Sequence, residues 1–162
     1  LAVDAPEPPP ALPPFDESVR MDPKTVQIPE WGTRWIDVNL TTQRIYAMVD
    51  DHPIYWAPVT TGRQGMSTPV GRHRIFSRVF NETMDSSTLG IPRNGPGGWY
   101  LPNVYYTQYF YTGGYALHSN YWANPSVFGN TPSSAGCVGM LIEDAEFFWN
   151  FATIGTEVVV HY

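Results

Sequence analysis

Apolar and polar residues alternate over several stretches of the chain, which is the pattern of strands with one buried face. In Trp35-Ile36-Asp37-Val38-Asn39-Leu40, for example, every second side chain is aliphatic. Short polar breaks separate the first three stretches and predict a meander of antiparallel strands. The stretches that predict strands are residues 35–40, 44–49, 54–59, 74–80 and 104–118.

One segment near the C-terminus has the spacing of a helix. Phe147, Phe148 and Phe151 give residues 143–151 an apolar face, and acidic side chains occupy the first turn, where the helix dipole favours them. The β-branched run within residues 157–162 then predicts a last strand in the interior of a sheet. Without a repeated βαβ pattern, the sequence predicts a mainly β fold with one or two short helices.

The connecting segments suggest how the chain is organised. Residues 62–71 predict a loop, and residues 81–98, rich in Gly, Pro, Ser and Asn, predict a long excursion of the kind that is often functional. Six prolines among residues 1–14 favour an extended segment with little to bury. We therefore expect a Pro-rich acidic leader or linker at residues 1–17, either a disordered terminus or a spacer, and one domain at residues 18–162.

Composition argues against several function classes. The formal net charge is −6, from nine Lys and Arg against 15 Asp and Glu, so no basic patch for nucleic acid is expected. No long apolar run predicts an integral membrane segment. No His, Cys and Asp residues have the spacing of a metal site, and we expect neither a metal nor a cofactor.

The chain has one cysteine, Cys137, in Ser134-Ala135-Gly136-Cys137-Val138. A single thiol forms no internal disulfide, and it is either a buried structural residue or a nucleophile. The small residues before it favour the nucleophile, because they let backbone N–H groups approach a reacting carbonyl. His118, which lies upstream, is the candidate base, and as an imidazolium it would stabilise a thiolate as an ion pair.

Several blocks of sequence, in this order, resemble the L,D-transpeptidase catalytic domain (YkuD-like) of bacterial cell-wall synthesis over about residues 33–162. These blocks are 36–46, Val59-Thr60-Thr61-Gly62, Ser67-Thr68-Pro69-Val70-Gly71, His118 through Gly129 to Gly136-Cys137-Val138, and 143–148 followed by 155–158. Two positions depart from the family pattern. Ala135 stands where His or Arg is usual, and Gly139 stands where Arg or Asn is usual.

The resemblance implies a β-sandwich of mixed sheets and a cysteine acyl transfer. In that family the thiol attacks a peptidoglycan tetrapeptide stem, D-alanine leaves, and the thioester passes to a diamino-acid side-chain amine as a 3→3 cross-link. Carried over, Cys137 is the nucleophile and His118 the base, with a backbone carbonyl near Ser119 orienting the imidazole. The N–H groups of Gly136 and Cys137 would stabilise the oxyanion, next to the shortened side chain of Ala135.

Four further residues are candidates for substrate binding. Trp122 and Tyr106 belong to an aromatic cluster around His118 that forms either core packing or a wall of the cleft. Arg63 lies in a loop, where it either is solvated or binds stem carboxylates. Ser134 precedes the cysteine turn.

Three functions remain open at this point. The thioester goes to an amine in a transpeptidase or to water in an L,D-carboxypeptidase or other hydrolase, and loss of turnover would leave a non-catalytic wall-binding domain. The resemblance implies stem peptides as substrates, carbapenem-type β-lactams as covalent inhibitors and an extracytoplasmic location in the cell envelope.

Overall fold

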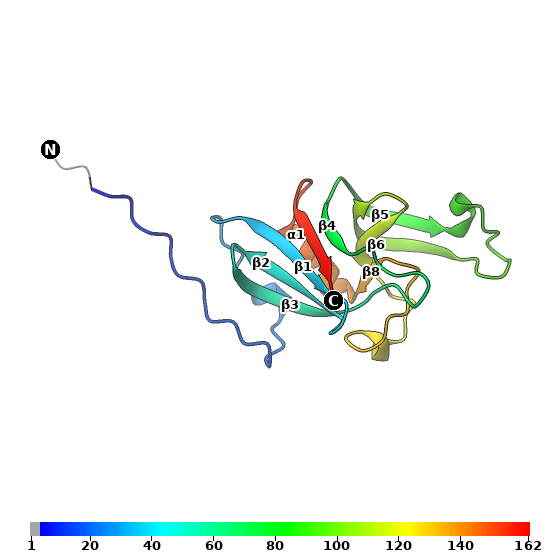
Figure 1. Cartoon of the computed structure of the whole chain (residues 1–162), viewed down its shortest axis with the longest axis horizontal. Helices are drawn as coiled ribbons and strands as arrows, with labels where there is room; N and C mark the ends of the chain where they lie inside the picture. Colours follow the sequence, from blue (N-terminus) through cyan, green and yellow to red (C-terminus); the bar gives the residue numbers. More distant parts are fainter. Residues whose placement is uncertain (1–3) are drawn as a thin grey trace.

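The computed structural model describes residues 4–162, in which nine strands form one strongly curled sheet around a single α-helix (Figure 1). Three short 3-10 helices, η1 to η3, accompany it. The elements are η1 (Pro23–Thr25), β1 (Arg34–Asn39), β2 (Arg44–Val49), β3 (His52–Thr60), β4 (Gly71–Arg74), β5 (Ser77–Asp85), η2 (Ser86–Leu89), β6 (Tyr100–Tyr111), β7 (Tyr115–Ser119), η3 (Pro125–Val127), β8 (Val138–Met140), α1 (Ile142–Phe151) and β9 (Glu157–His161). The mainly β prediction is therefore confirmed.

The strands follow the order β4-β9-β1-β2-β3-β8-β7-β6-β5. β1, β2 and β3 pair antiparallel in sequence order, which confirms the predicted meander. β9 lies between β4 and β1, so the predicted interior position of the last strand is also confirmed. Two pairs are parallel, β1 with β9 and β7 with β8, and the second of these positions the site described below.

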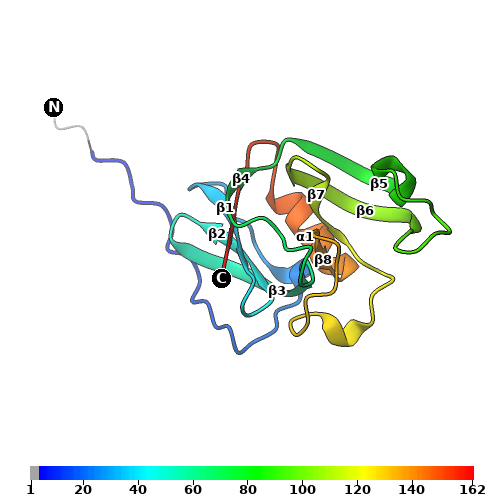
Figure 2. The same cartoon turned by 45° about the vertical axis from the view of Figure 1, so that its right-hand side comes forward.

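The core lies between α1 and the curled sheet, and most of its residues come from α1 and from β1, β2, β3, β7, β8 and β9 (Figure 2). Buried and partly exposed residues alternate along β1 and β2, as the sequence pattern predicts. The helix matches its predicted range to within one residue and buries Phe147, Phe148 and Phe151 in the main cluster. Burying one such side chain stabilises the fold by about 1.5–3 kcal/mol, which makes this helix face a main support of the core.

The strand predicted at residues 74–80 is two strands. Ile75 and Phe76 separate β4 from β5, because the chain changes partners there. The Ile75 N–H donates to the Thr156 carbonyl at 3.0 Å, next to β9, and the Phe76 N–H donates to the Tyr109 carbonyl of β6 at 2.9 Å. An alternating pattern reports which face is buried and not which strand is the partner.

The long excursion is shorter than predicted. Polar residues continue β5 as far as Asp85, where it pairs with Tyr100 of β6, so the irregular part covers only residues 86–99. The aromatic stretch at 104–118 is a hairpin, because a turn after Tyr111 divides it into β6 and β7. The paired β5 and β6 project from the body of the molecule and carry the irregular segment at their end (Figure 1).

The N-terminal segment is partly docked on the domain. Residues 1–3 of the expected leader lie outside the described residues, and the following Pro-rich stretch is extended. Leu12 already packs against the core, and Nε2 of His52 lies 2.9 Å from the Pro13 carbonyl oxygen. The division of the chain at residue 17 stays a prediction.

Arg20 anchors this segment to the first turn of α1. Its Nη2 donates to Oδ2 of Asp144 at 2.6 Å, and the hydroxyl of Tyr55 donates to Oδ1 of the same carboxylate at 2.5 Å. Asp144 is 1% exposed, so its charge depends on these two partners.

Replacing Arg20 by Ala should lower the free energy of unfolding by about 2–3 kcal/mol, because it leaves a buried carboxylate without its cation. This loss of stability is smaller than for a fully buried ion pair, because Arg20 is partly exposed and the Tyr55 hydroxyl still donates to the Asp144 carboxylate. Urea denaturation of Arg20→Ala measures the change. Arg72→Ala is the matched control, because Arg72 is mostly exposed and lies 3.8 Å from Glu157, and it should change the stability by less than about 1 kcal/mol. Equal effects of the two substitutions would contradict this role of Arg20.

Candidate active site

A cavity of about 850 Å³ runs between the β5–β6 projection and the loops on either side of β7. Cys137 and His118 both line it, on the strand pair β7–β8 and its approach. Trp99, the last residue of the irregular segment, and Leu101 of β6 also line it. The cavity is large enough for a peptide-sized ligand.

The pairing of β7 with β8 brings His118 and Cys137 to one face. Leu117 is opposite Val138 and His118 is opposite Gly139 in this parallel pair. Side chains alternate between the two faces of a strand, and Leu117 and Val138 both point into the core with 0% exposure. Their neighbours His118 and Cys137 therefore point the other way, into the cavity.

The turn before Cys137 is held by the two blocks of sequence that precede β4. Thr61 accepts hydrogen bonds from the N–H groups of Ser133 and Ser134 with its carbonyl oxygen, both at 3.0 Å. The buried hydroxyl of Thr68 donates to the Gly136 carbonyl at 2.8 Å and accepts from the Gly62 N–H at 3.0 Å. These contacts explain why the Thr60-Thr61-Gly62 and Ser67-Thr68-Pro69 blocks accompany the cysteine.

Gly136 is required by the shape of this turn. Its φ is +129°, and a Cβ at this position would lie 2.4 Å from the ring of Tyr115. A side chain would therefore strain the backbone and displace the ring, and Cys137 would move with them.

Ser134 lines the cavity and also holds the turn, and its predicted substrate contact stays a prediction. Its hydroxyl donates to the Cys137 carbonyl at 2.6 Å and accepts from the Gly136 N–H at 3.1 Å. The expectation that the Gly136 N–H serves the oxyanion is therefore not met in this geometry. Among residues 4–162, no acceptor takes the Cys137 N–H, which is the donor left for developing negative charge.

His118 is oriented as predicted, by a backbone carbonyl at Ser119. The imidazole is buried, and its Nδ1 lies 2.6 Å from the Ser119 carbonyl oxygen. A carbonyl only accepts, so the proton is on Nδ1 and the lone pair is on Nε2. The Trp122 ring stacks on the imidazole, with 5.6 Å between the ring centroids. The Ser119 hydroxyl accepts a hydrogen bond from the Tyr105 N–H at 3.0 Å, which fixes the residue whose carbonyl orients the imidazole. The imidazole is thus held ready to take a proton at Nε2.

Both reactive groups are neutral at pH 7, which differs from the expected ion pair. Burial lowers the pKa of His118 to about 4, against the opposing hydrogen bond to Ser119. Burial likewise raises the pKa of the Cys137 thiol to about 11; a hydrogen bond from the Ala116 backbone opposes the shift and the Glu82 carboxylate adds to it. The thiol lies 3.3 Å from the Gly114 carbonyl oxygen, to which it donates its proton in the resting state.

The remaining predicted residues divide between the cavity and the core. Arg63, Ala135 and Trp122 line the cavity. Tyr106 does not, and its prediction as a cleft residue is wrong. It has a φ of +60°, and its ring packs against Phe80 and Trp149, because α1 offers an aromatic partner on the other side of the strand.

Among the polar residues of the cavity, sequence reasoning did not single out Glu82 and Asn120, and it placed Tyr109 only within the aromatic cluster. The Tyr109 hydroxyl donates to Oε1 of Glu82 at 2.5 Å across β5 and β6. Glu82 is the only charged residue between Val79 and Met84, and this lone acid within a strand is the signal that was available. Asn120 gave no signal, because an Asn after a strand is common in turns.

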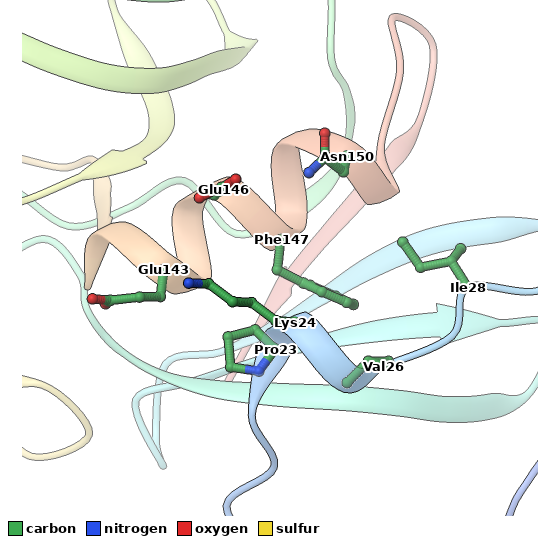
Figure 3. Close-up of a pocket in the computed structure, with 8 residues that line it drawn as sticks. All are labelled: Pro23, Lys24, Val26, Ile28, Glu143, Glu146, Phe147 and Asn150. Atoms are coloured by element: carbon green, nitrogen blue, oxygen red, sulfur yellow. The ribbon is translucent and has the colours of Figure 1, made fainter.

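A second hollow, of about 210 Å³, lies between η1 and α1 (Figure 3). Lys24 points along it toward the acidic side of the helix, where Glu143 and Glu146 lie. None of the eight described residues that line it is a cysteine, serine or histidine, so it offers no nucleophile or general base of those types.

Residues 4–162 contain neither a candidate metal site nor a candidate membrane-spanning helix. No three His, Cys, Asp or Glu side chains in this range are placed to hold a metal ion. Of the helices described there, none combines the length and the apolar character needed to cross a lipid bilayer.

The model of one protein family, the L,D-transpeptidase catalytic domain, matches residues 33–160. The chain belongs to this family. The match includes His118 and Cys137 and every strand of the sheet.

Relatives and solved structures agree with this assignment. The probable L,D-transpeptidase 3 of Mycobacterium tuberculosis is 38% identical over 103 residues, which are 64% of this chain and 37% of that protein. L,D-transpeptidase 1 of the same species is 30% identical over 104 residues, 64% of this chain and 40% of that protein. The chain thus spans about two fifths of the length of these curated relatives.

Among solved structures, the crystal structure of L,D-transpeptidase 3 from M. tuberculosis in complex with a faropenem-derived adduct has a TM-score of 0.74 at 28% identity. The superposition covers 80% of this chain and 60% of the chain in that crystal structure. LD transpeptidase LdtMt1 in complex with imipenem has a TM-score of 0.75 at 22% identity, with 80% and 59% covered, and supports the fold.

Alkylation of Cys137 by iodoacetamide should become faster up to about pH 11, because the raised pKa of its thiol delays formation of the thiolate. Mass spectrometry follows the rate without ambiguity, since Cys137 is the only cysteine. The urea-unfolded protein is the control and should level off above its ordinary thiol pKa of about 8.5. A plateau below pH 8.5 in the folded protein would show a preformed ion pair and contradict the neutral pair.

Proposed function

We propose that this domain is a cysteine L,D-transpeptidase that takes peptidoglycan stem tetrapeptides as acyl donors. The observation that carries the proposal is the joint placement of Cys137 and His118 in one peptide-sized cavity, with the lone pair of Nε2 available. Membership of the L,D-transpeptidase family supports it. The intact turn before Cys137 argues against a non-catalytic wall-binding domain, in spite of the departures at Ala135 and Gly139.

Acylation begins when Sγ of Cys137 attacks the carbonyl carbon after the third residue of the stem. The thiol proton passes to Nε2 of His118 during the attack, since neither group is charged beforehand. The Cys137 N–H donates to the oxyanion of the tetrahedral intermediate. The imidazolium then protonates the departing amine of D-alanine, since burial favours the neutral imidazole. A thioester remains.

Deacylation by an amine reverses these proton transfers. The acceptor amine attacks the thioester carbonyl, its proton passes to Nε2, and the thiol leaves after it regains that proton. An amide bond forms between the two stems. If water attacks instead, the product is a trimmed tripeptide.

Glu82 favours the amine over water as acceptor. Its carboxylate lines the same cavity and is fixed by the Tyr109 hydroxyl. It acts electrostatically on Cys137, since it contributes to the raised pKa of the thiol. A negative charge at this place attracts the side-chain ammonium of a diamino acid. The ammonium loses one proton to solvent before the neutral amine attacks, and the carboxylate accepts a hydrogen bond from that amine.

The amide variant Glu82→Gln should therefore lower the ratio of cross-linked dimer to trimmed tripeptide about tenfold, because a charge-assisted hydrogen bond to the acceptor is lost. Product analysis by mass spectrometry gives the ratio. Asp85→Asn is the control, since Asp85 also lines the cavity but pairs with Arg93 at 2.6 Å. An unchanged ratio in Glu82→Gln would remove Glu82 from acceptor binding.

Incubation with a stem tetrapeptide tests the function itself. The wild-type protein should gain the mass of the acyl group at Cys137, release D-alanine and form a dimeric product. The Cys137→Ala variant should stay folded and form neither adduct nor product, because no other thiol is present. Tripeptide as the sole product would establish the hydrolase instead. Absence of any adduct on the wild-type protein would overturn both.

Inhibitor and location follow from the same proposal. Carbapenem-type β-lactams present a strained carbonyl to the thiol, and the relatives in complex with a faropenem-derived adduct and with imipenem support acylation of Cys137 by this class. The proposed substrate is a polymer of the cell envelope, so the domain would act outside the cytoplasmic membrane.

A further inference from the structure

The side chain of Asn120 occupies the space above Gly139. A Cβ built on Gly139 would lie 2.5 Å from Nδ2 and 2.9 Å from Cβ of Asn120. Gly139 does not have a positive φ, so its backbone would accept a side chain, and the three atoms nearest to such a Cβ all belong to Asn120. The two positions therefore share one side-chain volume across β7 and β8.

The Asn120 amide lies in this volume without a protein partner. The Asn120 N–H donates to the Met140 carbonyl at 2.8 Å, which extends the β7–β8 ladder by one residue and fixes the backbone. The residue is 5% exposed, and within residues 4–162 its Oδ1 has no hydrogen-bond partner. Asn120 lines the cavity together with His118 and Cys137. Oδ1 has no accessible surface, so a ligand in the cavity reaches the amide through Nδ2, which has no acceptor within residues 4–162. An amide donor without a protein acceptor at the site indicates a ligand that accepts from it.

We propose that Asn120 is a substrate-positioning residue whose amide hydrogen-bonds a peptide group of the acyl donor next to the scissile bond. Nδ2 of a primary amide is an uncharged donor, which matches the C=O of a peptide group. The residue follows directly on His118 and Ser119, so it fixes the donor relative to the base. This inference rests on the proposed function.

The same geometry accounts for the departure at Gly139. The family pattern has Arg or Asn at this position, and here the polar group over the β7–β8 pair comes from the neighbouring strand instead. Glycine at 139 is then the condition for Asn at 120, because a side chain at both positions would overlap.

Three variants test the inference through acylation by stem tetrapeptide. Asn120→Ala should lower kcat/KM about tenfold, the effect of one lost hydrogen bond, while alkylation of Cys137 by iodoacetamide stays within about twofold. Asn120→Gly with Gly139→Asn restores an amide from the opposite strand without a side chain at both positions, and it should recover most of kcat/KM. Asn120→Gly with Gly139→Ala restores only a methyl group there and should stay as slow as Asn120→Ala. Thermal unfolding of each variant verifies that it is folded.

The outcomes separate this inference from the proposed function. If the wild type forms no adduct with the tetrapeptide, the proposed function fails and the role of Asn120 with it. If the wild type reacts and Asn120→Ala reacts equally fast, only the role of Asn120 is overturned. Equal recovery by the Ala and Asn substitutions at Gly139 would show that Asn120 fills space, which also overturns it.

Discussion

The parallel pairing of β7 with β8 is the constraint on which the site depends. Parallel neighbours need a long connection, and here it is the loop between Ser119 and Val138, which itself lines the cavity. The register places Leu117 and Val138 in the core and so directs His118 and Cys137 to the opposite face. Core packing and catalytic geometry are therefore two faces of one strand pair. A slip of one residue would turn the imidazole toward the core and Leu117 toward the cavity.

Most polar groups around the thiol are used to hold the backbone. The hydroxyls of Thr68 and Ser134 fix the carbonyls of Gly136 and Cys137, and the Ser119 carbonyl fixes the imidazole. This arrangement leaves few groups free for substrate, and the burial that accompanies it keeps both reactive groups uncharged. The neutral pair is a consequence of a tightly packed site, and it makes proton transfer part of the attack instead of a step before it.

Local pattern predicted the meander and the helix at 143–151, because each depends on spacing along the chain. The pair formed by Cys137 and His118 was predicted from the single thiol, its small neighbours and the family resemblance. The sequence did not indicate that the chain changes partner strands at Ile75, since both strands have the same alternation. Nor did it separate Tyr106 from its aromatic neighbours, because a positive φ inside a strand reverses the direction that alternation assigns. Glu82 and Asn120 were missed for a related reason: their role comes from what lies across the sheet.

The two departures from the family pattern differ in their surroundings. At Gly139 the neighbouring strand supplies a side chain of the kind that is absent, and the backbone distances leave room for only one of them. Ala135 is exposed in the cavity, and its methyl group offers no hydrogen bond to a substrate. A side chain that is missing at one position can therefore be replaced by a side chain from the paired strand that fills the same volume. A comparison with the family motif, made one position at a time, does not detect this replacement. On this argument the Asn120–Gly139 pair preserves a polar contact that the motif alone would count as lost.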